Sequence, residues 1–398
     1  MNETPRDIWD EIEDDNFRQV EDAKTPRPSP PYTVVSGRDL LAKSLPPEVH
    51  IWGQGLITAG KLTNVIGQGG TGKSRLLMQI GVEQTAGLHP LGFKPTADIG
   101  PMKWLFVGTE NGTHRLQSEF RTMVSSLDTE EQRERAKQFC FFHILEQDDD
   151  ADIVLREDNL PRWESMLRGV DPDVVCIDPF GDLHPGDINK PAEVRATLAA
   201  FLKTCRKGRH DRAIIIVHHA RAGKQNIAGA VGWDQGAFSL GAKDITTKAR
   251  VQIHVTFTDP DDWSKILLSL GKANDVSRFE PRGYRLNHET MRYEEDLDFD
   301  IEAWKADLDG KRHSATKLTP AELLDYISRN GGPKNGEKRQ WQEAAGEHFG
   351  VSARTVRGKI EDLIERKYLV VQADGNLRVT EKYKSKERRA EDGLSSKR

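Results

Sequence analysis

Short apolar runs alternate with longer amphipathic stretches between about residue 51 and residue 285. The runs have the length of β-strands, and the stretches between them have helical spacing. Strands that alternate with helices, and are apolar on both faces, are typical of a mostly parallel, doubly wound sheet. We therefore predict an α/β core domain over residues 36–290. Its predicted strands span residues 61–66, 103–108, 139–144, 173–178, 213–218, 250–257 and 265–271.

The pattern changes on both sides of this core. Residues 1–35 are acidic and then proline-rich, which predicts a disordered arm. A charged linker is expected over residues 291–317. Three short helical patterns and a turn between two β-prone runs predict a small domain over residues 318–380. Residues 381–398 are predicted to form a basic, disordered tail.

Composition narrows the class of protein. The chain has 398 residues, 36% hydrophobic and 30% charged, with no apolar run of the about 18 to 20 residues that a membrane span needs. The N-terminal segment MNETPRDIWDEIEDDNF is acidic, unlike a secretory signal, so we expect a cytoplasmic protein without a membrane partner. The cysteines, Cys140, Cys176 and Cys205, lie in apolar segments and are expected in the core. Because the net charge is −5, any binding to nucleic acid must come from local basic surfaces.

The segment GQGGTGKS, residues 67–74, matches the phosphate-loop pattern GxxxxGK[ST]. Its glycines let backbone N–H groups surround phosphate oxygens, its lysine reaches the terminal phosphates, and its serine is a magnesium ligand. A glycine-rich loop that only turns a strand into a helix is the alternative interpretation. The sequence predicts ATP and Mg²⁺ as ligands, with nucleotide contacts from Gly67, Gln68, Gly69, Gly70, Thr71, Gly72, Lys73, Ser74 and Arg75.

Two carboxylates follow predicted strands. Asp178 ends the apolar run VVCID, where parallel sheets bind ligands, and we expect it to hold magnesium with Ser74. The next residue is Pro179 rather than a glutamate, so the catalytic base must come from elsewhere. Glu110, which follows the strand 103–108, is the candidate for orienting the attacking water. The alternatives are an aspartate that caps a turn and a surface glutamate that starts a helix.

Two histidines, His218 and His219, end the apolar strand AIIIVHH. A histidine at the end of this strand could detect whether the terminal phosphate is present and transmit that information to the following loop. A buried structural histidine is the alternative.

These parts, in this order, resemble the RecA-like ATPase core, and most closely the RepA-type hexameric replicative helicases of plasmids and phages. The resemblance covers roughly residues 50–285. It implies that Lys73, Ser74 and Asp178 bind phosphate and magnesium, that Glu110 is the catalytic glutamate and that His219 is the sensor.

The resemblance also implies a homo-oligomer, a hexamer in that family, with ATP between neighbouring subunits. Arg250 resembles the arginine finger that one subunit supplies to the next, and Lys272 resembles its companion lysine. Positive charge there meets the charge that develops on the transferred phosphoryl group. The alternative is that Arg250 is only a surface residue.

DNA contacts are predicted in two places. The loop ARAGKQNIAGAVGWDQGAF lies where RecA-like rings face their channel, and Arg221 and Lys224 are candidates for contacts with single-stranded DNA. This loop departs from the helicase pattern, which more usually has an Arg-Gly-Ser stretch.

Residues 318–380 resemble a winged helix-turn-helix, with Ser352 as the N-cap of its recognition helix. Arg354, Arg357 and Lys359 are expected on or near one exposed face of that helix, where they would contact duplex DNA. Many winged helices bind proteins instead, and that alternative stays open.

The sequence therefore predicts an ATP-hydrolysing DNA motor, a ring-forming replicative helicase of a plasmid, phage or other mobile element. The main alternative is a non-motor RecA-like ATPase that acts as a DNA-binding switch or loader. A small-molecule kinase is disfavoured because no lid-like arginine-rich segment is present.

Overall fold

The structure of the chain, a computed structural model, divides into two units, Met1–Pro47 and Glu48–Arg398. It describes residues 35–143, 153–220, 243–259, 261–276, 279–308, 318–330, 338–373 and 375–383. In the first unit, helix α2 (Gly37–Ala42) begins after Ser36, whose hydroxyl accepts a hydrogen bond from Asp39 N at 3.1 Å. The rest of this section concerns the second unit.

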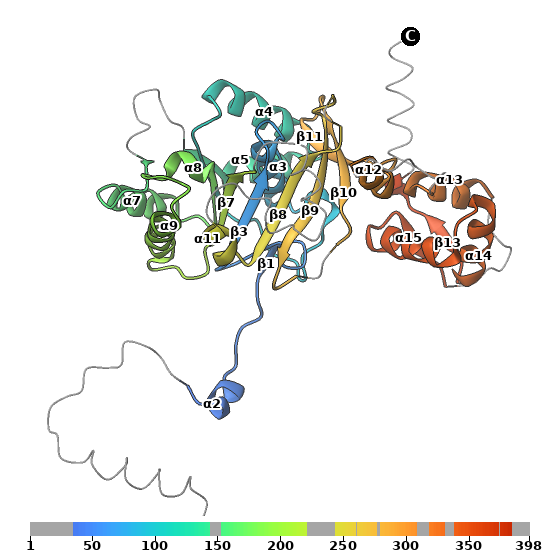
Figure 1. Cartoon of the computed structure of the whole chain (residues 1–398), viewed down its shortest axis with the longest axis horizontal. Coiled ribbons are helices and arrows are strands. Elements are labelled where there is room, and N and C mark those ends of the chain that lie inside the picture. The colour runs from blue at the N-terminus through green and yellow to red at the C-terminus, as the bar shows by residue number, and fades with distance from the viewer. Residues whose placement is uncertain are drawn as a thin grey trace, which may run out of the picture. The chain divides into compact units, whose positions relative to one another are not determined.

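A nine-stranded sheet forms the centre of the second unit (Figure 1). The strand order is β11-β10-β9-β8-β3-β7-β6-β4-β5. The strands are β3 (Leu62–Gly67), β4 (Trp104–Gly108), β5 (Cys140–His143), β6 (Val174–Asp178), β7 (Ala213–His219), β8 (Val251–Phe257), β9 (Lys265–Ala273), β10 (Arg282–Asn287) and β11 (Arg292–Glu295).

Six of these strands, from β8 to β5, run parallel to one another. All seven predicted strands are present, with ends that differ by one or two residues. The predicted α/β class with a mostly parallel sheet is confirmed. The carboxyl ends of β3, β7, β6 and β4 meet at one edge of the sheet, since Gly67 pairs with His219 and Gly108 with Asp178. We call this side the carboxyl edge.

The sheet extends further than the sequence predicted. Strands β10 and β11 add an antiparallel hairpin beside β9, and Tyr293 of β11 is 3% exposed. The predicted start of the linker, residue 291, is therefore too early, because residues 292–295 belong to the sheet. The charge of the run MRYEEDLDFD predicts a linker. A strand at this position can nevertheless carry that charge, because only alternate side chains of β11 need to be apolar.

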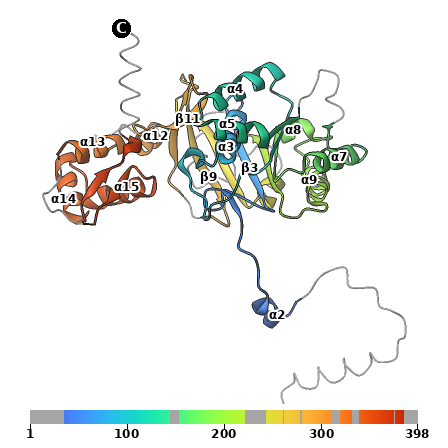
Figure 2. The ribbon, with the colours of Figure 1, turned by 180° about the vertical axis from the view of Figure 1, so that it is seen from behind.

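Helices cover both faces of the sheet, which Figures 1 and 2 show from opposite sides. Apolar residues of α3 pack on one face, and residues of α7, α9 and α11 pack on the other. Helices α4 and α5 pack against α3. The three cysteines are buried, as predicted. The helices of this part are α3 (Lys73–Thr85), α4 (Thr113–Ser125), α5 (Glu130–Phe139), α7 (Leu160–Val170), α8 (Phe180–Leu183), α9 (Pro191–Arg206) and α11 (Lys243–Lys248), with the 3₁₀ turn η1 (Pro90–Gly92).

A separate strand pair precedes the phosphate loop. Strands β1 (His50–Trp52) and β2 (Ile57–Thr58) are antiparallel, and Ile51, Trp52, Leu56 and Ile57 all belong to the core that contains α3. This pair thus extends the apolar core at the start of the second unit.

The C-terminal part has its own core. Helix α12 (Ile301–Leu308) leads to α13 (Pro320–Asn330), α14 (Lys338–Phe349), α15 (Ala353–Glu365) and the antiparallel pair β12 (Leu369–Val371) and β13 (Leu377–Val379). This is the predicted order of three helices and a hairpin. The assignment as a winged helix stays a prediction.

One buried arginine joins the C-terminal part to the sheet. Arg366, which follows α15, forms ion pairs with Asp362 of its own helix and with Glu295 of β11. A second contact runs from Arg282 of β10 to Asp362 at 3.5 Å. Because removing one member of a buried pair leaves an uncompensated charge, the joint depends on all of these groups. Among the described residues, no helix is long and apolar enough to cross a membrane.

Candidate functional site

The phosphate loop connects β3 to α3 at the carboxyl edge. Gly70 and Gly72 have φ values of 79° and 73°, in the left-handed region that glycine occupies without strain. A side chain at Gly72 would also collide with the Tyr293 hydroxyl, and one at Gly67 with the Val255 carbonyl oxygen. The loop is therefore held in shape by its own glycines and by strands β8 and β11.

Lys73 closes over this loop. Its Nζ donates hydrogen bonds to the carbonyl oxygens of Gly67 at 3.0 Å and Gln68 at 2.7 Å, and the residue is 6% exposed. Burial lowers the pKa of Lys73, while the charges of Asp178 and Glu110 act in the opposite direction. An anion bound in the loop would give this ammonium a direct charge partner.

Ser74 and Asp178 lie together at the start of α3 and the end of β6. Burial raises the pKa of Asp178, and a hydrogen bond from Ser74 and the charge of Lys73 partly offset that rise. A hydroxyl and a carboxylate are oxygen ligands of the kind that Mg²⁺ prefers. The two predicted metal ligands thus fit a magnesium ion, which would also favour the ionised form of Asp178.

Glu110 and His219 are brought into contact. Glu110 follows β4, His219 ends β7, and their Oε1 and Nε2 atoms are 3.0 Å apart. Both side chains are partly exposed, at 45% and 30%. The neighbouring His218 is 2% exposed and belongs to the interior. Of the two histidines, His219 is the one in contact with the candidate base.

Arg75, predicted to contact the nucleotide, is engaged by protein groups. Its guanidinium donates to Glu119 of α4 at 2.6 Å, and Arg115 donates to the same carboxylate oxygen at 3.0 Å. Burial opposes ionisation of Glu119, but the two arginines outweigh it and lower its pKa. Helix α4, which follows Glu110, is thereby tied to the phosphate-loop helix. A nucleotide contact of Arg75 stays a prediction.

Arg250 and Lys272 lie at the opposite edge of the sheet. Arg250 N donates to Leu62 O at the start of β3, about 16 Å along that strand from Gly67. Lys272 Nζ donates to the carbonyl oxygens of Thr246 and Thr247 at 3.0 and 2.9 Å, at the end of α11. Burial lowers the pKa of Lys272, and the nearby charge of Arg250 lowers it further. We call this edge of the sheet the amino edge. Its two cations, Arg250 and Lys272, lie far from the chain's own phosphate loop.

Asp275 holds Arg250 in place, a contact that was not predicted from the sequence. Its carboxylate accepts two hydrogen bonds from the Arg250 guanidinium, one of them at 2.8 Å, and another from Lys61 Nζ at 2.9 Å. These two cations keep the pKa of Asp275 well below its ordinary value. This aspartate ends the segment GKAND, residues 271–275, but its partners Arg250 and Lys61 are distant in sequence. Tyr293 was missed for the same reason.

The predicted DNA-binding residues have different positions. Arg221 and Lys224 lie outside the described residues. In α15, Ser352 is the N-cap as predicted, and it accepts a hydrogen bond from Thr355 N at 3.1 Å. Arg354 and Arg357 are exposed, and Arg357 pairs with Glu361 at 3.1 Å.

Lys359 differs from the other two. It is only partly exposed, and burial lowers its pKa, against the charges of Asp300 and Asp362. Its prediction on the exposed face with Arg354 and Arg357 is wrong. It lies five residues after Arg354, which is about 140° around the helix, so it points to another side.

The sequence and the structure were compared with those of known proteins. Residues 25–225 match the family model described as an AAA domain, just over half of the 398 residues. The RadB recombinase has a similar structure, with a TM-score of 0.38 and 14% identity over 59% of this chain and 90% of that one. The flagellar accessory protein FlaH from Methanocaldococcus jannaschii has a TM-score of 0.39 and 15% identity over 60% and 90%. None of the curated proteins compared with the sequence matches it.

Proposed function

The chain belongs to the AAA domain family, and on this premise we propose that it is an Mg²⁺-dependent ATPase that works as a ring on DNA. The resemblance to RepA-type replicative helicases supports a motor that separates DNA strands for a plasmid, phage or other mobile element. The proposal has three parts, which concern the chemistry, the assembly and the DNA.

The chemistry rests on one observation, the 3.0 Å contact between Glu110 and His219 at the edge that carries Lys73 and Asp178. Glu110 has the place and the exposure to orient a water molecule toward the terminal phosphate. A change at that phosphate then alters the Glu110–His219 contact, which His219 passes on to the segment after β7. This is how the site senses the state of its nucleotide.

The lysine and the metal ligands act on the phosphates themselves. Lys73 would exchange its two carbonyl acceptors for phosphate oxygens when ATP enters the loop. Mg²⁺ at Ser74 and Asp178 would neutralise part of the phosphate charge. Lys73 and Ser74 already lie at the start of α3 and Asp178 at the end of β6, so little rearrangement is required.

The assembly follows from the position of Arg250. It is 49% exposed at the amino edge, and it lies too far from its own phosphate loop to act there. In the proposed head-to-tail ring, the amino edge of one subunit would face the carboxyl edge of the next. Arg250 and Lys272 would then complete the neighbour's site.

DNA binding is the least direct part of the proposal. The exposed Arg354 and Arg357 on α15 support contact with the phosphates of a duplex. Arg221 and Lys224 are proposed for the single strand, from the resemblance alone. A C-terminal part that recruits a protein is the alternative for α15.

The decisive experiment is strand displacement on forked DNA, with ATP turnover measured in the same samples with and without single-stranded DNA. A motor gives ATP-dependent displacement and faster turnover when the single strand is present. Slow turnover that single-stranded DNA leaves unchanged would refute the motor and favour the alternative, a non-motor RecA-like ATPase that acts as a DNA-binding switch or loader. Absence of any turnover would refute the ATPase itself.

A further inference from the structure

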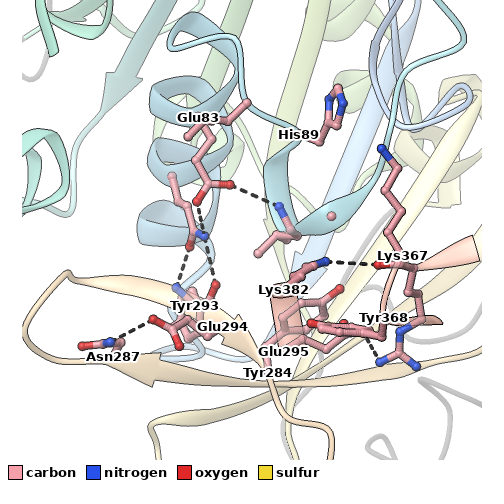
Figure 3. Close-up of a pocket in the computed structure, with 15 residues that line it drawn as sticks. Glu83, His89, Tyr284, Asn287, Tyr293, Glu294, Glu295, Lys367, Tyr368 and Lys382 are labelled. Carbon is pink, nitrogen blue, oxygen red and sulfur yellow. Dashed lines mark hydrogen bonds and ion pairs between the residues drawn. The ribbon is translucent and has the colours of Figure 1, made fainter. Parts of the chain in front are cut away.

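A second cavity, of about 640 Å³, lies where the C-terminal part meets the sheet (Figure 3). Its walls come from the end of α3, the segment around η1, strands β10 and β11, and the residues after α15. Gln79 and Glu83 line it, and Glu83 lies about 15 Å along α3 from Lys73. The volume is within the range of small-molecule sites, about 300–1,000 Å³. This cavity, the hinge cavity, is separate from the phosphate loop.

The acidic side chains of the hinge cavity have partners within the protein. Glu83 accepts hydrogen bonds from Gln79 at 2.9 Å and Leu91 N at 3.2 Å and lies 3.5 Å from Arg292. Glu294 accepts a hydrogen bond from Asn287 at 2.8 Å. Glu295 is paired with Arg366. Glu83 and Glu295 thus have cationic partners before any ligand enters, whereas the partner of Glu294 is a neutral amide.

The opposite wall carries the positive charge of two lysines. Lys367 and Lys382 line it and are exposed, and Lys382 Nζ donates to Arg366 O at 3.2 Å. His89 lines this wall as well. Burial lowers the pKa of His89, and the nearby charge of Lys367 is the next cause, followed by Lys94. In the described part of the chain, Lys367 has no carboxylate partner within ion-pair distance. A positive potential therefore remains on this wall.

Lys367 occupies a position where glycine is the usual residue. Its φ is 60°, and the bonds from Lys367 N to Ile364 O (3.0 Å) and from Tyr368 N to Leu363 O (2.9 Å) end α15 in a left-handed cap. A residue with a side chain is less stable than glycine in this conformation. Figure 3 shows that side chain extending along the wall on the side of His89. Lys367 thus adopts a backbone conformation that favours glycine, and its side chain lines the cavity.

We infer that the hinge cavity binds a small polyanion of the phosphorylated-metabolite class, held by Lys367, Lys382 and His89. Two or more negative charges on one small molecule match the spread of cations on this wall, and the cavity has the volume for such a ligand. The inference is independent of ATP hydrolysis at the phosphate loop.

The bound anion would be connected to the ATPase site through β11. Gln79, which lines the cavity, donates to Tyr293 O at 3.0 Å and accepts from Tyr293 N at 2.6 Å. The Tyr293 side chain reaches Gly72 of the phosphate loop. A ligand that moves β11 or the end of α3 therefore changes the packing of that loop, and so regulates turnover.

The test uses pyrophosphate as the probe and the full-length chain with Lys73→Ala, so that the phosphate loop does not contribute. Binding is measured by calorimetry in this background and in double variants that add Lys367→Gly, Lys382→Ala or, as a control, Lys203→Ala on α9. Glycine suits the left-handed position, so Lys367→Gly removes the charge without strain. We expect pyrophosphate binding that Lys367→Gly and Lys382→Ala each weaken about tenfold or more, and that Lys203→Ala leaves unchanged.

Two results would overturn the inference. One is that the Lys73→Ala chain does not bind pyrophosphate, or binds it equally well after Lys367→Gly. The other is that Lys367→Gly weakens binding of a single-stranded oligonucleotide while pyrophosphate does not bind, which would assign the wall to nucleic acid. If the inferred site exists but the ATPase proposal fails, pyrophosphate still binds to the Lys73→Ala chain although the wild type turns over no ATP.

Discussion

The two edges of the central sheet differ in the parts of a catalytic site that they hold. At the carboxyl edge, Lys73, Ser74, Asp178, Glu110 and His219 are gathered from four strands into one site within the chain. At the amino edge, Arg250 and Lys272 are held by Asp275 and by the end of α11, with no phosphate loop of their own chain in reach. Under the proposed assembly, one chain therefore carries two halves of different sites, and catalysis requires a second copy.

The largest effect is expected at the amino edge. Replacing Arg250 by alanine should lower kcat about 10³-fold, because an arginine finger stabilises charge in the transition state. Affinity for ATP should change little, since the phosphate loop is intact. The measurements are steady-state turnover and equilibrium nucleotide binding. Arg121→Ala, an exposed arginine on α4, is the matched control, and equal effects of the two substitutions would contradict the account.

The next effect concerns the carboxyl edge. Glu110→Gln keeps the size of the side chain but removes the base, so kcat should fall about 10²-fold or more while ATP binding remains. Single-turnover hydrolysis together with binding measures both. Glu157→Gln, an exposed glutamate before α7, should leave turnover unchanged. Normal turnover in Glu110→Gln would remove Glu110 from the role of base.

A smaller effect, on stability, tests the buried carboxylate. Burial raises the pKa of Asp178 in the nucleotide-free fold, so its contribution to stability is present below its ordinary pKa and is lost as the pH rises through the raised value. Asp178→Asn avoids this loss. The melting temperature of the variant minus that of the wild type should therefore increase from about pH 4 to about pH 7.

The same variant should lose its Mg²⁺-dependent turnover. Stability and activity would then change in opposite directions at this residue. A melting-temperature difference that does not vary with pH would show that Asp178 is not buried as an unfavourable charge.

The smallest effect concerns Asp275. Asp275→Asn removes the carboxylate that holds Arg250 but leaves the arginine charge in place. Because an exposed ion pair of this kind contributes little, turnover should stay within about fivefold of the wild type. The measurement is kcat at several protein concentrations. A loss as large as that of Arg250→Ala would mean that placement by Asp275, more than the charge, determines the function of Arg250.

The parallel part of the fold was predictable because each strand there is a short apolar run with a helix on either side. The hairpin β10–β11 was not, since MRYEEDLDFD carries more charge than a buried strand is expected to have. The candidate site was predictable at residues that end strands, such as Asp178 and Glu110. Contacts that join distant segments, such as Asp275 with Arg250 or Tyr293 with Gly72, leave no local pattern. Lys359 was misplaced because a charged position on a helix was taken as exposed.

The most direct test of the divided site is to mix two inactive chains. Arg250→Ala keeps an intact carboxyl edge, and Glu110→Gln keeps an intact amino edge. In mixed rings, about one quarter of the interfaces pair the two intact edges, so the mixture should recover about one quarter of the wild-type turnover. A mixture that shows only the sum of the two residual activities, from chains shown to assemble together, would contradict the account.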